Sequence, residues 1–220
     1  MSRAMIAPAP AETRDRLLEA AGEVFAAEGY RNTTVRRICG RAGANVAAIN
    51  YHFHGKAGLY AAVLEHAQRV SAERYPPDLG IRNGVGPDAR LRAFIRALLL
   101  RTLDRGRPAW HGQLMLREMA EPTPALDAVV RDAIRPLFDS LRAIVRELLG
   151  RSATPREVTR CAFSIVGQCL FFKHANAVIA RLEPRQRYGP SEIRELADHI
   201  AGFSLAALRA SSPNGRRPRP

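Results

Sequence analysis

The chain has 220 residues, of which 46% are hydrophobic, and its formal net charge is +13. This length accommodates one medium domain or a small domain beside a larger one, and the hydrophobic fraction is sufficient for a folded core. No apolar run approaches the roughly 20 residues that a membrane-spanning helix needs, so we expect no membrane partner. Three cysteines without regular spacing predict a reducing, cytoplasmic setting and no disulfide framework.

The positive charge indicates a nucleic acid or another polyanion as partner, but it does not locate the contact. All but two of the 34 basic residues are arginines. Residues 1–75 carry ten basic and seven acidic groups, whereas residues 76–220 carry 24 and 14. The excess of positive charge is therefore larger in the second part of the chain.

Residues 1–11 contain one arginine and no apolar core of signal-peptide length, and we interpret them as a disordered arm. A first helix is predicted from about Thr13 to Glu28, where Gly29 ends it. Its inner stripe consists of Leu17, Ala21, Val24 and Phe25. We expect Phe25 to be the central core residue of a small three-helix head, packed against the two short helices that follow.

Residues 34–53 are predicted to form those two short helices, joined by a tight turn. Thr33 is placed to cap the first helix and Asn45 the second, because a side-chain oxygen there can accept a hydrogen bond from an unpaired amide. Gly43 lies at the turn, where a positive φ is often required. In the second helix we expect Ala48 and Ile49 to face inward, and Val46, Ala47 and Asn50 to face outward. This is the geometry of a helix-turn-helix, whose second helix lies in the major groove of DNA.

The residue types of this stretch agree with contact to DNA. No Asp or Glu occurs from Gly29 to Leu64, whereas the same span holds four arginines and Lys56, and each cation placed at a phosphate releases counterions. Asn50 can form the paired hydrogen bonds that adenine offers, and Val46 or Ala47 can touch a thymine methyl. The predicted DNA-binding residues are Thr33, Thr34, Arg36, Asn45, Val46, Ala47, Ala48, Asn50, Tyr51, His52 and Lys56. Of these, Asn50 and residues 46–48 are expected to read bases, and Thr33, Asn45, Tyr51, His52 and Lys56 to hold phosphates.

Residues 13 to 64 resemble the DNA-binding domain of TetR/AcrR-family transcriptional regulators. The segment TRDRLLEAAGEVFAAEGYRNTTVRRI is similar to the family's first helix and its entry into the second, and AGANVAAINYHFHGKAGLY to its recognition helix and the start of its fourth. The motifs AA-x-x-x-F-A-x-x-G-Y, T-x-x-x-I, A-G and Y-H-F all occur at the family's spacing. One departure is Gly55-Lys56-Ala57-Gly58, where family members usually carry a serine and one or two glutamates.

Beyond the head, we predict helices and no strand, because alternating β-branched runs are absent. A fourth helix from about Gly55 to Tyr75 leads into a Gly- and Pro-rich loop at 76–88. Further helices are expected from Ala89, over Ala109–Ala120, over Ala125–Leu149 with a kink at Pro136, over Arg156–Leu182 and over Ser191–Leu208. The expected fold is all-α, with an N-terminal helix-turn-helix domain at 12–75 and a larger helical domain at 76–210.

The last two predicted helices differ from the others in their apolar surface. The Arg156–Leu182 segment is apolar on most of its faces, and a helix of this kind needs burial on more than one side. Because a chain of this size offers little surface to cover it, we expect a two-fold homodimer through the last two helices. The resembled family pairs its C-terminal helices in this way. Residues 211–220 are interpreted as a disordered basic tail.

No constellation typical of an enzyme is present, so we expect no catalytic residue and no cofactor. Glu195 and His199 share a helix face, but the further ligand-bearing helices of a metal site are missing, and we predict no metal. For Cys161 and Cys169, structural packing is favoured over redox sensing. For Cys39, which lies beside arginines, core filling is favoured over a lowered thiol pKa.

The resemblance implies an effector pocket in the larger domain. Soft and aromatic linings suit apolar or amphipathic ligands, although each such residue is more often plain core. The candidates are Phe94, Trp110, His111, Met115, Glu118, Met119, Phe138, Phe172 and His174, with Arg117 as a further polar candidate. The segment PAWHGQLMLREMAEPTPALDAVVRDAIRPLFD also resembles the C-terminal domain of the CecR (YbiH) subgroup, whose members are associated with control of export and drug-sensitivity genes.

These features lead to the hypothesis of a homodimeric, ligand-responsive transcriptional repressor that binds a palindromic operator and is released by a small-molecule effector. The alternative is a constitutive architectural or activating DNA-binding protein without a ligand, whose larger domain serves only to dimerise.

Overall fold

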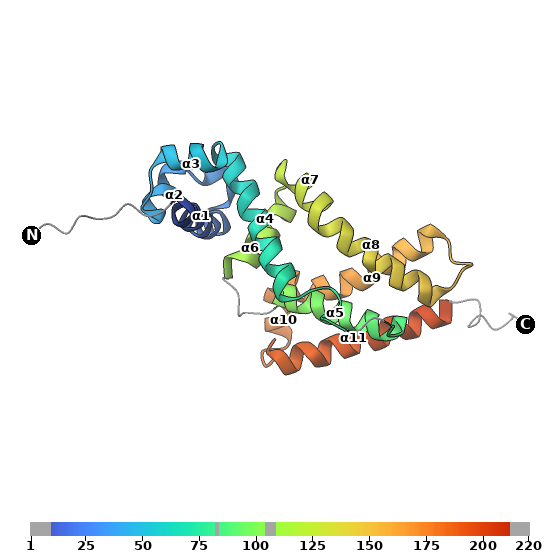
Figure 1. Cartoon of the computed structure of the whole chain (residues 1–220). Coiled ribbons are helices and arrows are strands. Elements are labelled where there is room, and N and C mark those ends of the chain that lie inside the picture. The colour runs from blue at the N-terminus through green and yellow to red at the C-terminus, as the bar shows by residue number, and fades with distance from the viewer. Residues whose placement is uncertain (1–9, 82–83, 104–108, 212–220) are drawn as a thin grey trace, which may run out of the picture. The chain divides into compact units, whose positions relative to one another are not determined.

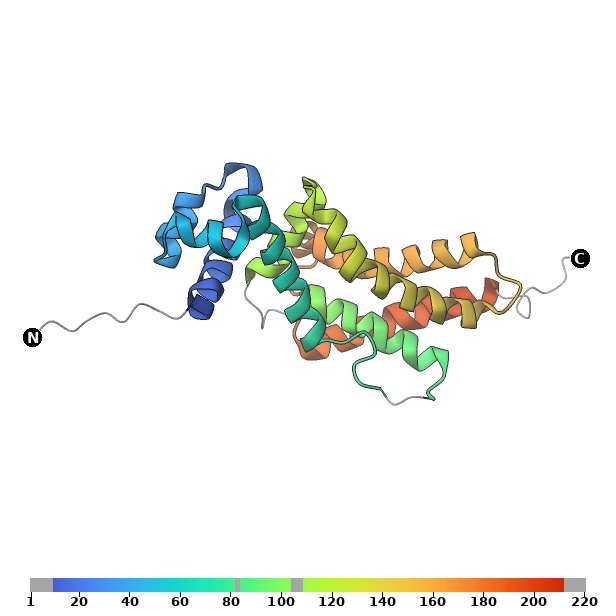
Figure 2. The same cartoon turned by 45° about the horizontal axis from the view of Figure 1, so that its top comes forward.

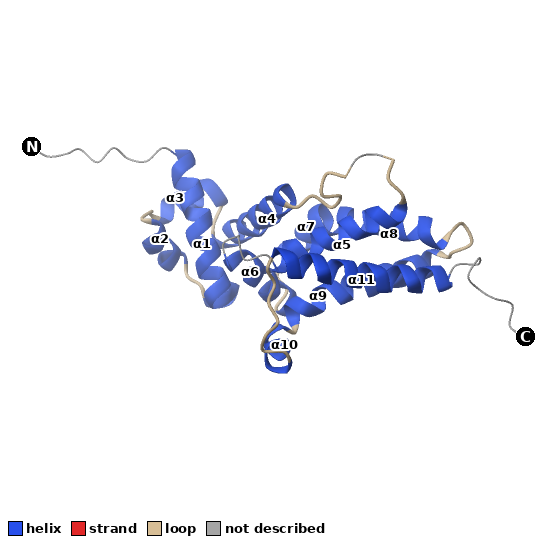
Figure 3. Ribbon diagram, turned by 90° about the horizontal axis from the view of Figure 1, so that it is seen from below, coloured by secondary structure: helices blue, strands red, loops and turns tan. Residues whose placement is uncertain are grey.

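The computed structural model describes residues 10–81, 84–103 and 109–211, and within these ranges it contains helices and no strand (Figure 3). The all-α prediction is therefore confirmed. Most of the predicted N-terminal arm and C-terminal tail lies outside the described residues, although Pro10 and Ala11 already belong to the first helix. Contacts divide the chain into two compact units: unit 1 is Met1–Val70 with Arg107–Val130, and unit 2 is Ser71–Gly106 with Arg131–Pro220.

Unit 1 contains the N-terminal helices and a later pair of helices (Figure 1). Its elements are α1 (Pro10–Asn32), α2 (Val35–Ala42), α3 (Val46–Phe53), α4 (Lys56–Arg74, up to Val70), α6 (Ala109–Ala120) and α7 (Ala125–Val129). Gly29 has φ 81° and ψ 163°, so the helical conformation of α1 is broken at the residue where the sequence predicted its end.

The core of unit 1 is centred on Phe25, as predicted. Phe25 is fully buried and belongs to one cluster with Ile38, Ile49 and Phe53. Its ring meets Tyr60 of α4 edge-on, with the ring centroids 4.8 Å apart. Aromatic pairs in this arrangement add to the stabilisation that apolar burial provides.

Helix α6 packs within unit 1, in the same core cluster as the head. Trp110 and Leu114 are buried there against α1. Gly22 makes this packing possible, because a Cβ at that position would lie 2.6 Å from the Trp110 ring. The sequence interpretation assigned all of 76–210 to the larger domain, whereas the contacts group the segment 107–130 with residues 1–70.

Unit 2 is a bundle of long helices (Figure 2). Its main elements are α5 (Pro87–Leu103), α8 (Arg135–Leu149), α9 (Pro155–His174), α10 (Asn176–Leu182) and α11 (Pro190–Ser211). Helix α9 starts with a capping box, in which Thr154 and Glu157 exchange side-chain-to-backbone hydrogen bonds of 3.2 and 2.8 Å. Buried aliphatic residues of α5, α8, α9 and α11 form its core.

Two predicted helices are interrupted in the structure. The Ala125–Leu149 segment passes through a π-helical turn at Val130–Ile134, which ends two residues before Pro136, where the kink was predicted. The Arg156–Leu182 segment, however, was predicted as one helix and consists of α9 and α10, bent by 71°. Among the described residues no single helix is long and apolar enough to cross a membrane, and only this bent pair reaches that composition together.

Helices α9 and α11 each carry large apolar side chains that unit 2 leaves exposed. They lie against each other in the bundle, with Gln168 of α9 and Ser204 of α11 in hydrogen-bond contact at 3.4 Å. Phe163 and Phe171 of α9 are 61% and 56% exposed, and Phe203 of α11 is 64% exposed; these apolar side chains are called the open face of α9 and α11 below.

The cysteines pack as structural residues. Cys39 and Cys169 are buried, and burial raises the pKa of both thiols, that of Cys169 to about 12. The pKa of Cys161 is raised as well. A lowered thiol pKa at Cys39 is therefore contradicted, and the core-filling interpretation agrees with its position.

Candidate DNA-binding site

Two side-chain caps and a left-handed turn define the helix-turn-helix. Asn45 caps α3 as predicted, its Oδ1 accepting from Ala48 N at 2.8 Å. Gly43 ends α2 with φ 59° and ψ 40°. Arg16 of α1 donates to the carbonyl oxygens of Ala42 and Gly43, the latter at 3.0 Å, and a Cβ on Gly43 would lie 2.9 Å from its guanidinium. Glycine is thus favoured at the turn by its left-handed backbone conformation, and a larger residue there would also displace the end of the Arg16 side chain.

Thr34, and not Thr33, caps the first helix. The Thr34 hydroxyl accepts from Arg37 N at 3.3 Å. Thr33 is 2% exposed and donates from Oγ1 to the carbonyl of Gly29 at 2.8 Å. The predicted cap was therefore one residue off, and Thr33 does not present its hydroxyl to a phosphate in this structure. The consecutive threonines made the two positions indistinguishable by sequence.

Helix α3 presents the predicted outward face. Ile49 is buried and Ala48 half-buried, whereas Val46, Ala47, Asn50 and Tyr51 are exposed. Tyr51 is 78% exposed, and its ring lies edge-on to half-buried His52 at a centroid distance of 4.8 Å. The exposed edge thus combines an amide, a phenol and two small apolar groups, which are suited to base edges and backbone in a groove.

Lys56 lies against the head. Its Nζ donates to the carbonyl of Arg31 at 3.3 Å and lies 4.6 Å from the centroid of the Tyr30 ring. Arg36, the other predicted cation, has an exposed side chain. In the structure without DNA, the two cations therefore differ in their surroundings: Lys56 contacts the head, whereas the Arg36 side chain is exposed to solvent.

The unusual Gly55–Gly58 stretch has a structural reason. Gly55 adopts φ 105°, and a Cβ on Gly58 would lie 1.8 Å from the carbonyl oxygen of Phe53. The end of α3 and the first turn of α4 therefore approach more closely than any side chain at position 58 permits.

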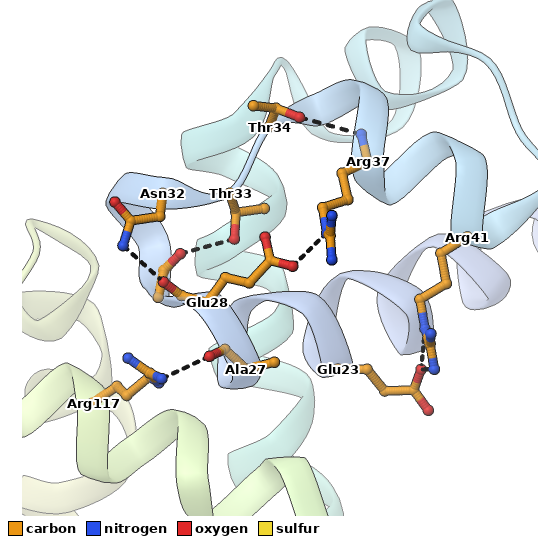
Figure 4. Close-up of polar contacts among 10 residues, drawn as sticks. Glu23, Ala27, Glu28, Asn32, Thr33, Thr34, Arg37, Arg41 and Arg117 are labelled. Carbon is orange, nitrogen blue, oxygen red and sulfur yellow. Dashed lines mark hydrogen bonds and ion pairs between the residues drawn. The ribbon is translucent and has the colours of Figure 1, made fainter.

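Two ion pairs that were not predicted from the sequence join α1 to α2 (Figure 4). The carboxylate of Glu28 pairs with Arg37, and that of Glu23 pairs with Arg41. These glutamates are the last two carboxylates before the span from Gly29 to Leu64 that contains none. That position in the sequence is the signal from which a pairing with the α2 arginines could have been predicted.

Arg117 and Glu118 connect α6 with the rest of unit 1. Arg117 donates from Nε to Ala26 O at 2.6 Å. It also donates from Nη2 to Ala27 O at 2.7 Å (Figure 4), and both carbonyls lie shortly before the break at Gly29. Glu118 is fully buried and accepts from Tyr60 Oη at 2.7 Å and from Thr123 N at 2.8 Å. Desolvation, together with this carboxyl group, raises the pKa of Tyr60.

The nine predicted pocket residues do not gather in one unit. Unit 1 holds Trp110, His111, Met115, Glu118 and Met119, and unit 2 holds Phe94, Phe138, Phe172 and His174. Trp110 and His111 are packed together in the interior of unit 1, where Trp110 Nε1 lies 3.3 Å from Glu19 Oε2. Phe138 stacks on the exposed Phe163. The effector pocket therefore stays a prediction.

A shallow groove of about 600 Å³ lies between α1 and α2 of unit 1. Its lining is charged and includes Asp15, Glu19 and Glu23 on one side and Arg41 on the other. Within the described ranges, no group of three or more His, Cys, Asp or Glu side chains is placed to hold a metal ion.

Two family models match the chain. Residues 17–63 match the model for bacterial regulatory proteins of the tetR family, and residues 87–208 match the C-terminal domain of the HTH-type transcriptional dual regulator CecR. The chain belongs to the TetR family. This TetR-family regulator therefore carries a DNA-binding helix-turn-helix followed by a CecR-type C-terminal domain.

Individual relatives agree with this assignment. CecR of Shigella flexneri is 28% identical over 173 residues, which cover 74% of this chain and 76% of CecR. SrpR and TtgW, both of Pseudomonas putida, are each 41% identical over 70 residues. Those matches cover 32% of this chain and only 33% of SrpR and 52% of TtgW. Like this chain, these relatives are transcriptional regulators and not enzymes.

Solved structures share the fold of the regulator. The crystal structure of AibR in complex with isovaleryl coenzyme A and operator DNA matches with a TM-score of 0.64 at 21% identity, over 87% of this chain and 97% of AibR. A TetR-family regulator from Streptomyces coelicolor matches with a TM-score of 0.66 at 21% identity, over 90% and 96% of the two chains.

Proposed function

We propose that this TetR-family regulator is a homodimeric repressor that binds a palindromic operator in the cytoplasm and is released by a small-molecule effector. The observation that carries the DNA-binding part is the exposed edge of α3, Val46, Ala47, Asn50 and Tyr51, on a helix that Asn45 caps and Gly43 sets in position. Two such helices, related by two-fold symmetry, would enter major grooves about 34–36 Å apart.

The homodimer rests on the open face of α9 and α11. Three exposed phenylalanines on adjacent helices, Phe163, Phe171 and Phe203, leave apolar area that a second copy of the same face covers. Such an isologous contact brings the same helices of two protomers together.

The effector part rests on the family. AibR is named as a complex with both isovaleryl coenzyme A and operator DNA, and CecR is named as a dual regulator. For this chain we propose an apolar or amphipathic effector and, by analogy with CecR, targets among export or drug-sensitivity genes. Release requires that the effector bind one state of the dimer more tightly than the other, typically by about 1–3 kcal/mol of coupling.

The test is a mobility-shift titration on the DNA immediately upstream of the protein's own gene, against random competitor, over a range of salt concentrations. We expect a competitor-resistant complex with two protomers per site. An affinity that depends on salt concentration but is the same for the upstream DNA and the random competitor would contradict a specific operator.

A second candidate is a constitutive DNA-binding protein without an effector, whose larger domain only dimerises. It is favoured by one observation: Glu118, a predicted polar pocket residue, already has the internal partners Tyr60 and Thr123. A thermal-shift screen of amphipathic compounds distinguishes the two, because a ligand that binds the folded state raises Tm by mass action. A compound that raises Tm and also releases the operator supports the effector-responsive repressor.

A further inference from the structure

The arginines of α2 fall into two classes. Arg37 and Arg41 are paired with carboxylates of α1, Arg37 through Nε to Glu28 and Arg41 through Nε and Nη2 to Glu23. Arg36 is exposed and forms no ion pair within the described part of the chain. Among the described residues, a carboxylate of the protein therefore already neutralises the positive charge of Arg37 and of Arg41, but not that of Arg36.

The pairs lie at the surface. The side chains of Arg37 and Arg41 are 66% and 55% exposed, whereas those of Glu28 and Glu23 are 24% and 45% exposed. The guanidinium groups are thus in solvent, where a phosphate can compete for them, and each glutamate holds its arginine from the α1 side (Figure 4).

The position of α2 brings these arginines into the region of the DNA backbone. In a helix-turn-helix the first helix crosses the backbone while the second enters the groove. Arg37 lies in the first turn after the Thr34 cap, and Arg41 lies one turn further, at the charged groove beside Asp15 and Glu19. Arg41 therefore faces more than one carboxylate.

We propose that Glu28 and Glu23 are specificity-determining residues, which restrain Arg37 and Arg41 and so limit sequence-independent binding to phosphates. An arginine that is free to take any phosphate strengthens binding to all DNA. The operator complex gains less from such an arginine, because base contacts hold it in one register, whereas a non-specific complex can shift until a phosphate comes within reach. The two glutamates thereby increase the ratio of the affinity for the operator to the affinity for random DNA. This inference rests on the proposed operator binding.

The test compares Glu28→Gln, Glu23→Gln and the double variant with the wild type, using fluorescence anisotropy. The probes are a random-sequence duplex and the duplex that the wild type selects from a randomised pool. We expect each single variant to bind the random duplex more tightly and the selected duplex with a smaller gain. The slope of log affinity against log salt should steepen by about 0.9 for each phosphate gained, so that the advantage over the wild type shrinks roughly 3.5-fold between about 50 and 200 mM salt.

Glu65→Gln is the matched control. Glu65 is an exposed carboxylate of α4 that has no arginine partner among the described residues, so this variant makes the same change in charge within unit 1. An equal effect of Glu65→Gln would assign the result to net charge and overturn the proposal. The effect of Glu28→Gln should also disappear in an Arg37→Gln background, because the glutamate acts through that arginine.

Other outcomes separate the inference from the function on which it rests. If Glu28→Gln binds both duplexes more weakly, the ion pair only holds α2 in place. If its affinity for both duplexes rises equally, the ion pair does not affect specificity. Either result overturns the inference. Failure of the randomised pool to yield any preferred duplex with the wild type would instead contradict operator binding itself. Circular dichroism melting of each variant confirms that the head is folded.

Discussion

The buried carboxyl group of Glu118 accepts hydrogen bonds from α4 and from the segment that leads into α7. Besides Tyr60 Oη and Thr123 N, Thr123 Oγ1 donates to it at 3.0 Å. Buried donors that lose their acceptor keep the cost of desolvation without compensation. At the scale of single residues, Glu118 therefore ties α6 to α4 and to the segment that leads into α7.

Replacing Glu118 with alanine is expected to lower the free energy of unfolding by about 3 kcal/mol, because three donors lose their acceptor and a cavity is left. Chemical denaturation with urea measures this loss. Glu118→Gln, which retains one carbonyl acceptor, should cost clearly less, and Tyr60→Phe about 1 kcal/mol. Equal stability of Glu118→Ala and the wild type would contradict this account of the hydrogen bonds.

Tyr60 predicts a dependence of stability on alkaline pH. Burial and the contact with Glu118 raise its pKa above the ordinary value of about 10. A group with a raised folded-state pKa adds stability that is fully present below the unfolded pKa and is lost as pH rises through the folded pKa. The free energy of unfolding should therefore fall above about pH 10, and the fall should be smaller in Tyr60→Phe. An identical alkaline profile for both proteins would rule out this contribution.

Asn50 and Lys56 are expected to contribute to DNA binding in different ways. Asn50→Ala should weaken binding to the operator by about 1–3 kcal/mol and leave random DNA unchanged, because it removes a base contact. Lys56→Ala should weaken binding to both evenly, since a phosphate contact carries no sequence information. Competition binding with both DNAs measures the difference. An Asn50→Ala variant that loses the same affinity for both DNAs, or a Lys56→Ala variant that loses affinity for the operator alone, would contradict this division.

At the scale of elements, the close approach of α3 and α4 depends on one residue without a side chain. Gly58→Ala would place a Cβ 1.8 Å from the Phe53 carbonyl oxygen, so α3 must move relative to α4. We expect a lower Tm and weaker operator binding, because the recognition helix shifts. Gly40→Ala in α2 is the control, since a Cβ there meets nothing within 4 Å and should stabilise the helix by about 0.5–1 kcal/mol. Similar Tm changes in the two variants would argue against the steric explanation.

At the scale of the whole molecule, the proposed dimer predicts the effect of a charge on the open face of α9 and α11. Phe203→Asp should convert a dimer of twice 24.2 kDa into monomers, because a carboxylate at an apolar interface loses its hydration. Light scattering after size exclusion measures the mass. Ile134→Asp, at an exposed apolar residue outside α9 and α11, should leave the dimer intact. A wild-type protein that is monomeric at micromolar concentration would contradict the proposed dimer.

The sequence alone determined the features that arise within a few residues of chain. Apolar spacing placed α6 at its observed bounds, and the Asn45 cap and the Gly43 turn followed from local backbone chemistry. The inward and outward residues of α3 were also predictable, because one helical period decides them. The family resemblance followed from the same local motifs.

Tertiary structure decided the features that depend on partners distant in sequence. The packing of Trp110 against Gly22 and the hydrogen bond from Tyr60 to Glu118 both join segments whose approach no local pattern encodes. The grouping of α6 with the head, and not with the larger domain, has the same origin. The local hydrophobic periodicity predicts which face of a helix is apolar, but only the tertiary structure shows which other helix packs against that face.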